Sequence, residues 1–337
     1  MNFSERLAGD LRPWPDYFAD LLLCVVLWLP VSGAVAAESS YPARPIRLVV
    51  PLAPGGSTDF TGRLIAAPLS ERLGQSVVVD NRPGAGGLLG TNIVAKATPD
   101  GYTLLFVASS FTVIPSMHKK IPYDPVRDFA PVTTATSYAY LVVVHPSVAA
   151  TSIKELIALA KAKPGTLNFG SGGVGTNTHL GVELFTSMAG INMIHVPYKS
   201  GGQSTNALLG GEVKLLFIAI PVALQFVKAG KLRLLAYTGA KRSSVVPDVP
   251  TVGQSGLPGF EYSGWNGLLA PARTPRAMIK ILYSELGALL KTPQMRERFA
   301  KEGQEPGGIS SGEFAATIKS EVAKWAKAIP QFGIQQD

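Results

Sequence analysis

The sequence predicts an α/β protein in which parallel sheets are covered by helices on both faces. From Tyr41 onwards, short apolar β-branched segments alternate with amphipathic segments, which is the pattern of strands connected by helices. No segment repeats at a period of about 20–50 residues, so a solenoid is not expected. The chain has 337 residues, of which 46% are hydrophobic, so it is long enough for two domains and too apolar to be disordered.

The elements follow from these patterns in chain order. The expected strands are Ile46–Pro51, Val77–Asn81, Tyr102–Ala108, Tyr140–His145, Leu167–Gly170, Ile194–Tyr198, Lys214–Ile218 and Leu232–Tyr237. The expected helices between them are Thr58–Leu73, Leu88–Ala97, Ser152–Lys163, Thr176–Ala189, Gln203–Leu209 and Ala223–Ala229. After Gly264–Pro271 the chain becomes mostly helical, with helices expected at Pro275–Lys291, Pro293–Glu302 and Ser311–Ile329. In the last of these, the apolar residues share one helical face.

Residues 1–37 are expected to be a cleavable secretory signal. Leu21–Leu29 forms a short apolar core, Pro30 interrupts it, and the small residues from Ser32 to Ala37 give an A-x-A-like end. The stretch before the core is not net positive, so an uncleaved anchor or a start placed too far upstream is the alternative.

Removal of this segment changes the chemistry of the chain. It takes away Cys24, the single cysteine, so the exported protein is expected to have no disulfide, thiolate metal site or cysteine nucleophile. Residues 1–37 hold two basic and four acidic residues, so the rest carries 29 Lys+Arg against 19 Asp+Glu, a net charge of +10. These basic residues are scattered and not interleaved with aromatic residues, so nucleic acid is not expected as a partner. A solvated basic surface that steers anionic ligands is the simpler interpretation.

A glycine-rich turn between the first strand and the first helix is one candidate binding site. Its sequence is Pro54-Gly55-Gly56-Ser57-Thr58-Asp59. The glycines let the backbone approach a ligand, and the first N–H groups of the following helix favour an anion. An ordinary capped turn is the alternative for the same residues. A carboxylate at Asp59 would repel an anion, so we expect it to hold backbone N–H groups or to accept from a ligand hydroxyl or ammonium group.

A second turn of this kind follows the strand expected at Leu167–Gly170. Its glycines match G-x-G-x-x-G, but the next strand contains no carboxylate for a ribose, so a nucleotide is not expected. A second anion-accepting helix start is what this turn predicts. As a neutral imidazole in the first turn of that helix, His179 could hydrogen-bond the loop or the ligand.

Two such turns indicate two lobes that hold one small anion between them. Other loops follow strand ends at the same edge and carry Ser109, Ser110 and Tyr198. An enzyme is disfavoured, because the sequence has no G-x-S-x-G nucleophile elbow, no phosphate-binding P-loop and no H-E-x-x-H pair. The remaining histidines are expected to be packed or surface residues, namely His118, His145 and His195. We expect no metal and no cofactor.

These motifs, in this order, resemble the Bug family, which are periplasmic solute-binding receptors of tripartite tricarboxylate transporters in Gram-negative bacteria. The landmarks are Tyr41–Ile46, Pro54–Asp59, Asn81–Gly90, Pro99–Leu105, Gly170–His179, Val196–Lys199, Ala229–Arg233 and Pro247–Thr251. The resemblance covers nearly all of the mature chain. It implies a type II periplasmic-binding fold, with two doubly wound α/β lobes and a ligand cleft between them. We expect one lobe to comprise residues 41–138 and 259–337 and the other to comprise residues 139–258.

The resemblance also implies a function and a set of ligand contacts. Such a receptor captures a small organic carboxylate, delivers it to membrane transporter subunits and generally acts as a monomer. One side of the ligand is expected to meet Pro54, Gly55, Gly56, Ser57, Thr58 and Asp59. The other side is expected to meet Ser171, Gly172, Gly173, Gly175, Thr176 and His179, while Ser109, Ser110 and Tyr198 line the variable end.

Specificity and partner are less closely defined by the resemblance. Many relatives carry an acidic or amide residue after the strand that matches Lys214–Phe217, where this chain has Ile218-Ala219-Ile220. This difference favours a less polar carboxylate. The sequence leaves two alternatives to a transport receptor, namely a stand-alone ligand sensor that feeds a sensor kinase and, less favoured, a secreted hydrolase.

Overall fold

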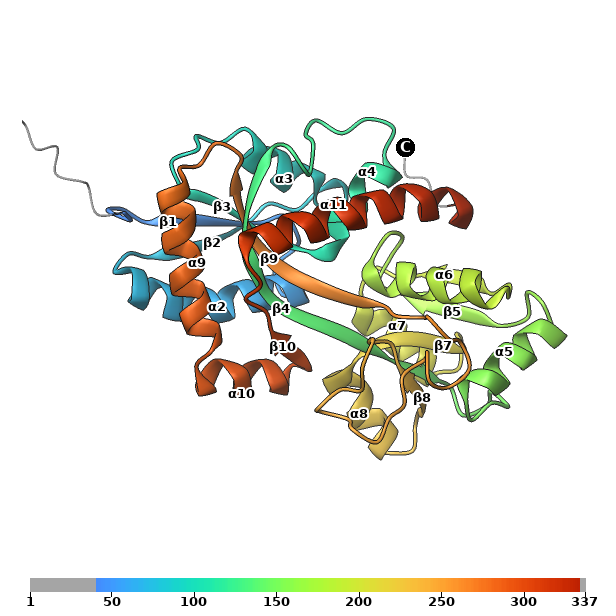
Figure 1. Ribbon diagram of the computed structural model, residues 1–337. Coiled ribbons are helices and arrows are strands. Elements are labelled where there is room, and N and C mark those ends of the chain that lie inside the picture. Colours follow the sequence, from blue (N-terminus) through green and yellow to red (C-terminus); the bar gives the residue numbers. More distant parts are fainter. Residues whose placement is uncertain (1–40, 334–337) are drawn as a thin grey trace, which may run out of the picture. The chain divides into compact units, whose positions relative to one another are not determined.

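A computed structural model describes residues 41–333 of the chain, and the predicted signal segment lies outside these described residues. Its strands are β1 (Ile46–Val50), β2 (Val77–Asn81), β3 (Thr103–Ala108), β4 (Phe129–Val144), β5 (Asn168–Ser171), β6 (Ile194–Pro197), β7 (Leu215–Ala219), β8 (Arg233–Tyr237), β9 (Ser263–Pro271) and β10 (Gln304–Pro306). The strands form one sheet in the order β2-β1-β3-β9-β4-β7-β5-β6, and β8 and β10 also pair with β4 (Figure 1).

Helices connect these strands and cover the sheet. The α-helices are α2 (Ser57–Leu73), α3 (Leu88–Ala95), α4 (Ile114–Met117), α5 (Ile153–Ala162), α6 (Asn177–Ala189), α7 (Gly201–Leu209), α8 (Ile220–Lys228), α9 (Arg276–Leu290), α10 (Pro293–Lys301) and α11 (Ser311–Ala328). Short 3₁₀ turns are η2 (Ala85–Gly87), η3 (Ser109–Thr112) and η4 (Ile329–Phe332). None of the helices between residues 41 and 333 is both long and apolar enough to cross a membrane.

Every strand and helix predicted from the sequence is present, with ends that differ by a few residues except in β4, which begins at Phe129 and not at Tyr140. The prediction of parallel sheets is only partly right. Strand β1 is parallel to β2 and β3, and β5 is parallel to β6 and β7, but β4 is antiparallel to β7, β8, β9 and β10. The sheet is therefore mixed, and the antiparallel pairs surround β4.

Strand β4 is the element that joins the two halves of the sheet. Its residues from Phe129 to Ala139 pair with β9, while its residues from Tyr140 to Val144 pair with β7 and β8 (Figure 1). The first half of the sheet then contains β2, β1, β3 and β9, and the second contains β7, β5, β6 and β8. Sequence analysis found only the end of β4 and missed β9, because long-range pairing leaves no periodicity in the sequence.

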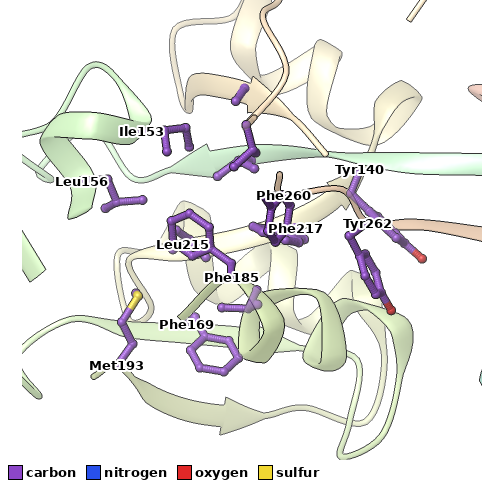
Figure 2. Packing of buried hydrophobic residues seen from close by; sticks show 14 of the residues in the cluster. Tyr140, Ile153, Leu156, Phe169, Phe185, Met193, Leu215, Phe217, Phe260 and Tyr262 are labelled. Atoms are coloured by element: carbon purple, nitrogen blue, oxygen red, sulfur yellow. The ribbon is translucent and has the colours of Figure 1, made fainter. Parts of the chain in front are cut away.

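Both faces of each half carry a hydrophobic cluster. In the first half, α2, α9 and α10 cover one face, and α3 and α11 cover the other. In the second half, α5 and α6 cover one face, and α7 and α8 cover the other. The α5–α6 cluster combines aliphatic and aromatic residues, and Figure 2 shows Phe169, Phe185, Phe217 and Phe260 packed around β5 and β7. Helices on both faces leave the strand ends and their loops as the accessible edge of the sheet.

Gly90 shows how closely one such helix approaches the sheet. A Cβ atom at this position of α3 would lie 2.5 Å from the Arg82 carbonyl oxygen and 2.8 Å from Pro51 Cα. Both neighbours are backbone atoms, so they cannot move aside as a side chain would. Gly287 in α9 is a helical glycine of the opposite kind, because a Cβ there would meet nothing within 4 Å.

We therefore expect Gly90→Ala to destabilise the protein by about 1–3 kcal/mol, which is the usual range for overpacking. The matched control, Gly287→Ala, is expected to stabilise it by about 0.5–1 kcal/mol, because alanine is the better helix former. Urea unfolding followed by circular dichroism measures both changes. Equal effects of the two substitutions would contradict this account of α3 packing.

Candidate functional site

The first predicted turn ends in a helix start with free donors. Helix α2 begins at Ser57 with Gly56 as its N-cap, and no side chain caps it. Among residues 41–333, no hydrogen-bond acceptor is present for the backbone N–H groups of Ser57, Thr58 and Asp59. Gly56 and Ser57 are exposed. This turn therefore presents the Ser57 N–H and the positive end of a helix dipole at an exposed position, with the N–H groups of the buried Thr58 and Asp59 behind it.

Asp59 is held inside the loop and does not project from it. Its carboxylate accepts from the Gly55 N–H at 2.8 Å and from Asn81 Nδ2 at 2.9 Å, and it lies 3.0 Å from Arg63 Nε. Burial acts to raise the pKa of Asp59, but these hydrogen bonds and the Arg63 charge outweigh it and hold the pKa below its usual value. Of the two roles expected for this residue, the structure shows the first, which is to hold backbone N–H groups.

In the second turn, most glycine N–H groups are bonded to side chains of the same turn. The Gly172 N–H donates to Thr178 Oγ1 at 3.1 Å, and the Gly173 N–H donates to Ser171 Oγ at 3.1 Å. Within the described part of the chain, the N–H groups of Asn177 and Thr178, in the first turn of α6, have no acceptor. The donors free to meet a ligand are therefore those of the helix start.

His179 supports this turn through a hydrogen bond to its backbone. It is 2% exposed, its Nδ1 accepts from the Gly175 N–H at 3.1 Å, and its Nε2 lies 3.4 Å from Glu183 Oε1. An accepting Nδ1 carries no proton, so we assign the neutral tautomer with its hydrogen on Nε2. The imidazole thus bonds the loop, which is one of the two roles expected from the sequence.

The two turns share one hydrogen-bond arrangement. In each, a glycine with positive φ donates its N–H to a side chain four residues later, in the first turn of the helix. The pairs are Gly55 with Asp59, where φ is 79°, and Gly175 with His179, where φ is 75°. Only glycine adopts this backbone region without strain. The side chains at both helix starts therefore brace the loop, and the helix N–H groups remain unoccupied.

His195 lies beneath the second turn, although sequence analysis treated it as an ordinary packed residue. Its ring stacks on His179 with centroids 3.8 Å apart, and its Nε2 lies 2.7 Å from Ser171 Oγ. This serine–histidine contact is not a catalytic pair, because Ser171 is 0% exposed and cannot meet a substrate. The pair instead supports the glycine loop. Histidine spacing in the sequence does not show this, because the contact joins two different strands.

The remaining predicted residues follow neighbouring strand ends. Ser109 and Ser110 begin the turn η3 after β3, and Tyr198 follows β6 with its N–H donating to the Ser171 carbonyl at 3.1 Å. A small cavity of about 10 Å³ brings Ser110 next to Pro51 and Gly87. The loops after β1, β2 and β3 therefore meet at one edge of the first half, and those after β5 and β6 meet in the second half.

Two residues that were not selected from the sequence, Asn177 and Tyr138, connect the loops of the first half with those of the second half. Asn177, the first residue of α6, donates from Nδ2 to the Tyr138 hydroxyl at 3.0 Å, and its Oδ1 lies 3.5 Å from Ser109 Oγ. The second half of the site thus touches the first through Asn177. Asn177 lies within the glycine-rich motif Gly170–His179, so its position could have marked it, whereas nothing in the sequence indicates its contact with Tyr138.

A groove of about 600 Å³ beside α9, α10 and β10 is lined by none of the predicted site residues. Across residues 41–333 there is also no group of three or more His, Cys, Asp or Glu side chains that could hold a metal ion. The chemistry that these turns offer is hydrogen-bond donation to an anion.

The chain is similar to known proteins over most of its length. Residues 61–334 match the profile described as Tripartite tricarboxylate transporter family receptor. Protein BugT of Bordetella pertussis is 36% identical over 317 residues, which span 93% of this chain and 97% of that protein.

Solved structures show the same fold. A structure from R. palustris with adipate is 35% identical, has a TM-score of 0.78 and covers 88% of this chain and 99% of its own. MatC from Rhodopseudomonas palustris with bound malate is 29% identical, has a TM-score of 0.74 and covers 86% of this chain and all of its own. The prediction of a periplasmic-binding-protein fold is confirmed.

The histidine pair generates a pH prediction. Burial, followed by the facing His179, lowers the pKa of His195 to about 4, below about 6.5 for an unperturbed histidine. The unfolded chain therefore binds a proton that the folded protein excludes. The stability contributed by neutral His195 is complete above pH 6.5 and decreases as pH falls from 6.5 towards 4.

We expect the urea midpoint to fall less between pH 7 and pH 5 in His195→Gln than in the wild type. Glutamine does not titrate, yet its amide can still reach Ser171. The control is His145→Gln, which changes a histidine bonded to Ser147 away from this turn. If His195→Gln and the wild type lose the same stability over this range, His195 is not kept neutral by the fold.

Proposed function

Because the chain belongs to the tripartite tricarboxylate transporter receptor family, we propose that it is a periplasmic receptor that binds one small organic carboxylate between its two glycine-rich turns. The observation that carries the proposal is the pair of uncapped helix starts, at α2 and α6, whose N–H groups have no acceptor within residues 41–333. Carboxylates suit such donors, because charge-assisted hydrogen bonds are stronger than neutral ones.

In this arrangement the ligand lies between two lobes. One lobe comprises residues 41–138 and 259–337 and the other comprises residues 139–258, which is supported by the change of partners in β4 between Ala139 and Tyr140. Approach of the lobes excludes water and strengthens each N–H bond to the anion. The closed form is then the form that a membrane partner recognises.

Each predicted contact has a place in this proposal. In the first lobe, the helix donors come from Ser57, Thr58 and Asp59 within the turn formed by Pro54, Gly55 and Gly56. In the second lobe, Thr176 precedes the α6 donors, and Ser171, Gly172, Gly173, Gly175 and His179 form the turn beneath them. The other end of the ligand lies against Ser109, Ser110 and Tyr198.

The ligand class is a carboxylate with an apolar body. Structures of relatives contain adipate and malate, both of which carry two carboxylate groups. At the end of β7 this chain has the exposed Ala219 followed by the buried Ile220. A side chain without polar atoms at that strand end favours the less polar of such ligands.

Delivery to a tripartite transporter is the partner step of the proposal, and the family supports it. A stand-alone sensor would instead have no membrane subunits encoded near it. Neighbouring open reading frames for a large and a small membrane subunit distinguish the two, and light scattering of the purified protein tests whether it is a monomer.

A thermal-shift panel of carboxylates tests the binding step. With residues 38–337, at least one panel member is expected to stabilise the protein by about 2.7 kcal/mol at a concentration of 100 Kd. The panel includes adipate, malate, citrate, benzoate, short monocarboxylates and glutamate. The absence of any shift across it would contradict a carboxylate receptor.

Variants of the two turns test where the carboxylate binds. Gly56→Val places a branched side chain beside the α2 donors, and the Gly56 Cβ position has only an ordinary 3.5 Å contact with the Ala53 carbonyl oxygen. Thr176→Ala removes the hydroxyl that donates to the Gly173 carbonyl at 2.7 Å. Each is expected to weaken binding at least tenfold, or about 1.4 kcal/mol.

Matched controls exist for both substitutions. Gly312→Val changes a glycine in the first turn of α11, where a Cβ has open space, and Thr166→Ala removes another hydroxyl that donates to a carbonyl, that of Lys163. Both controls are expected to bind the carboxylate as the wild type does. Wild-type affinity in Gly56→Val and Thr176→Ala would place the site elsewhere.

A further inference from the structure

One partly buried tyrosine hydroxyl lies where the two halves of the proposed site meet. Tyr138 accepts from Asn177 Nδ2 at 3.0 Å, and Asn177 is the first residue of α6. Ser109, which begins the turn after β3, contacts the same asparagine, because its Oγ lies 3.5 Å from Asn177 Oδ1. Ser109 and Asn177 belong to different halves of the sheet.

Tyr138 lies in β4 close to the point where this strand changes its pairing partner. Tyr138 stands opposite Gly264 of β9, and β4 changes from β9 to β7 two residues later, at Tyr140. A Cβ atom on Gly264 would lie 2.5 Å from the Tyr138 ring, so the ring is seated only because position 264 has no side chain. The hydroxyl is thereby fixed to the strand segment that joins the two halves.

Asn177 connects Tyr138 to the backbone N–H donors proposed at the start of α6. In the second turn, the N–H groups of Asn177 and Thr178 have no acceptor among the described residues, so the Asn177 side chain tethers a residue that carries a free donor. Tyr262, which precedes β9, supports the same amide with its hydroxyl 3.4 Å from Asn177 Oδ1. Figure 2 shows Tyr140 and Tyr262 side by side, with their hydroxyls pointing away from the aromatic cluster.

Ser109 is braced from the other side by the C-terminal helix. The Thr112 hydroxyl donates to the Ser109 carbonyl at 2.8 Å and lies 3.0 Å from Glu321 Oε2 on α11. The Trp265 Nε1 of β9 donates to the other oxygen of Glu321 at 3.0 Å. The turn that carries Ser109 is therefore held by β9 and α11 independently of its contact with Asn177.

We propose that Tyr138 is a positioning residue that sets the two halves of the carboxylate site relative to each other through Ser109 and Asn177. Burial raises the pKa of this hydroxyl to about 12, so it stays protonated and can accept from Asn177 while donating its own hydrogen. The inference rests on the proposed function, because it assigns a role in that site. It adds that the turn after β3 and the start of α6 are energetically coupled even without a ligand.

Hydrogen exchange of the ligand-free mature chain tests this coupling. Removal of one hydrogen bond is expected to accelerate amide exchange about fivefold in the segments that it holds. Asn177→Ala should accelerate exchange in residues 105–116, and Ser109→Ala should accelerate it in residues 171–180. Tyr138→Phe should accelerate both segments and leave residues 276–301 unchanged.

The matched control is Tyr123→Phe, which removes a buried hydroxyl that has no hydrogen-bond partner within the described residues. It is expected to change neither segment. A purely local role for these residues predicts that each variant affects only its own segment, and that result, or no change in Tyr138→Phe, overturns the proposal. A carboxylate panel without a shift would refute the receptor function and leave this exchange result unaffected, so the two failures are distinguishable.

Discussion

The structure depends on the backbone hydrogen bonds of one strand. Strand β4 pairs with β9 up to Ala139 and with β7 and β8 from Tyr140 onwards, so a single extended segment is shared by both halves of the sheet. An extended strand in two ladders cannot bend freely, because bending breaks hydrogen bonds on both sides. The pairing of β4 thus restricts how the two halves of the sheet are placed relative to each other. The loops at the strand ends are restricted in the same way, because they are attached to these strands.

The two glycine-rich turns solve the same problem with different side chains. A helix start that binds an anion must leave its N–H groups free, yet the loop before it needs support. In the first turn Asp59 supplies the support and Arg63 offsets its charge, while in the second the neutral His179 supplies it beside Glu183. Support from inside the loop keeps the outward-facing donors unoccupied, which an ordinary Ser or Thr N-cap would not do.

The sequence predicts local structure well because strands, helix faces and glycine turns leave signals within about 20 residues. The prediction fails where the role of a residue depends on a contact with a residue that is distant in the sequence. Gly264 and Gly267 weaken the strand signal of β9, yet a Cβ at either position would collide with a ring, that of Tyr138 or of Phe314. The roles of His195, Tyr138 and Asn177 were missed for the same reason, since each depends on a partner from another element.

The charge arrangement links the junction to the proposed carboxylate site. Arg63 is engaged by Asp59 and Asn81, so the positive potential at the first turn comes from helix N–H groups and not from a free cation. Such dipoles act over a short range and are weakened by water. An anion held by dipoles alone therefore needs both helix starts close to it at the same time. The contact of Ser109 with Asn177, which also bonds Tyr138, brings the loop after β3 to the start of α6 without a ligand.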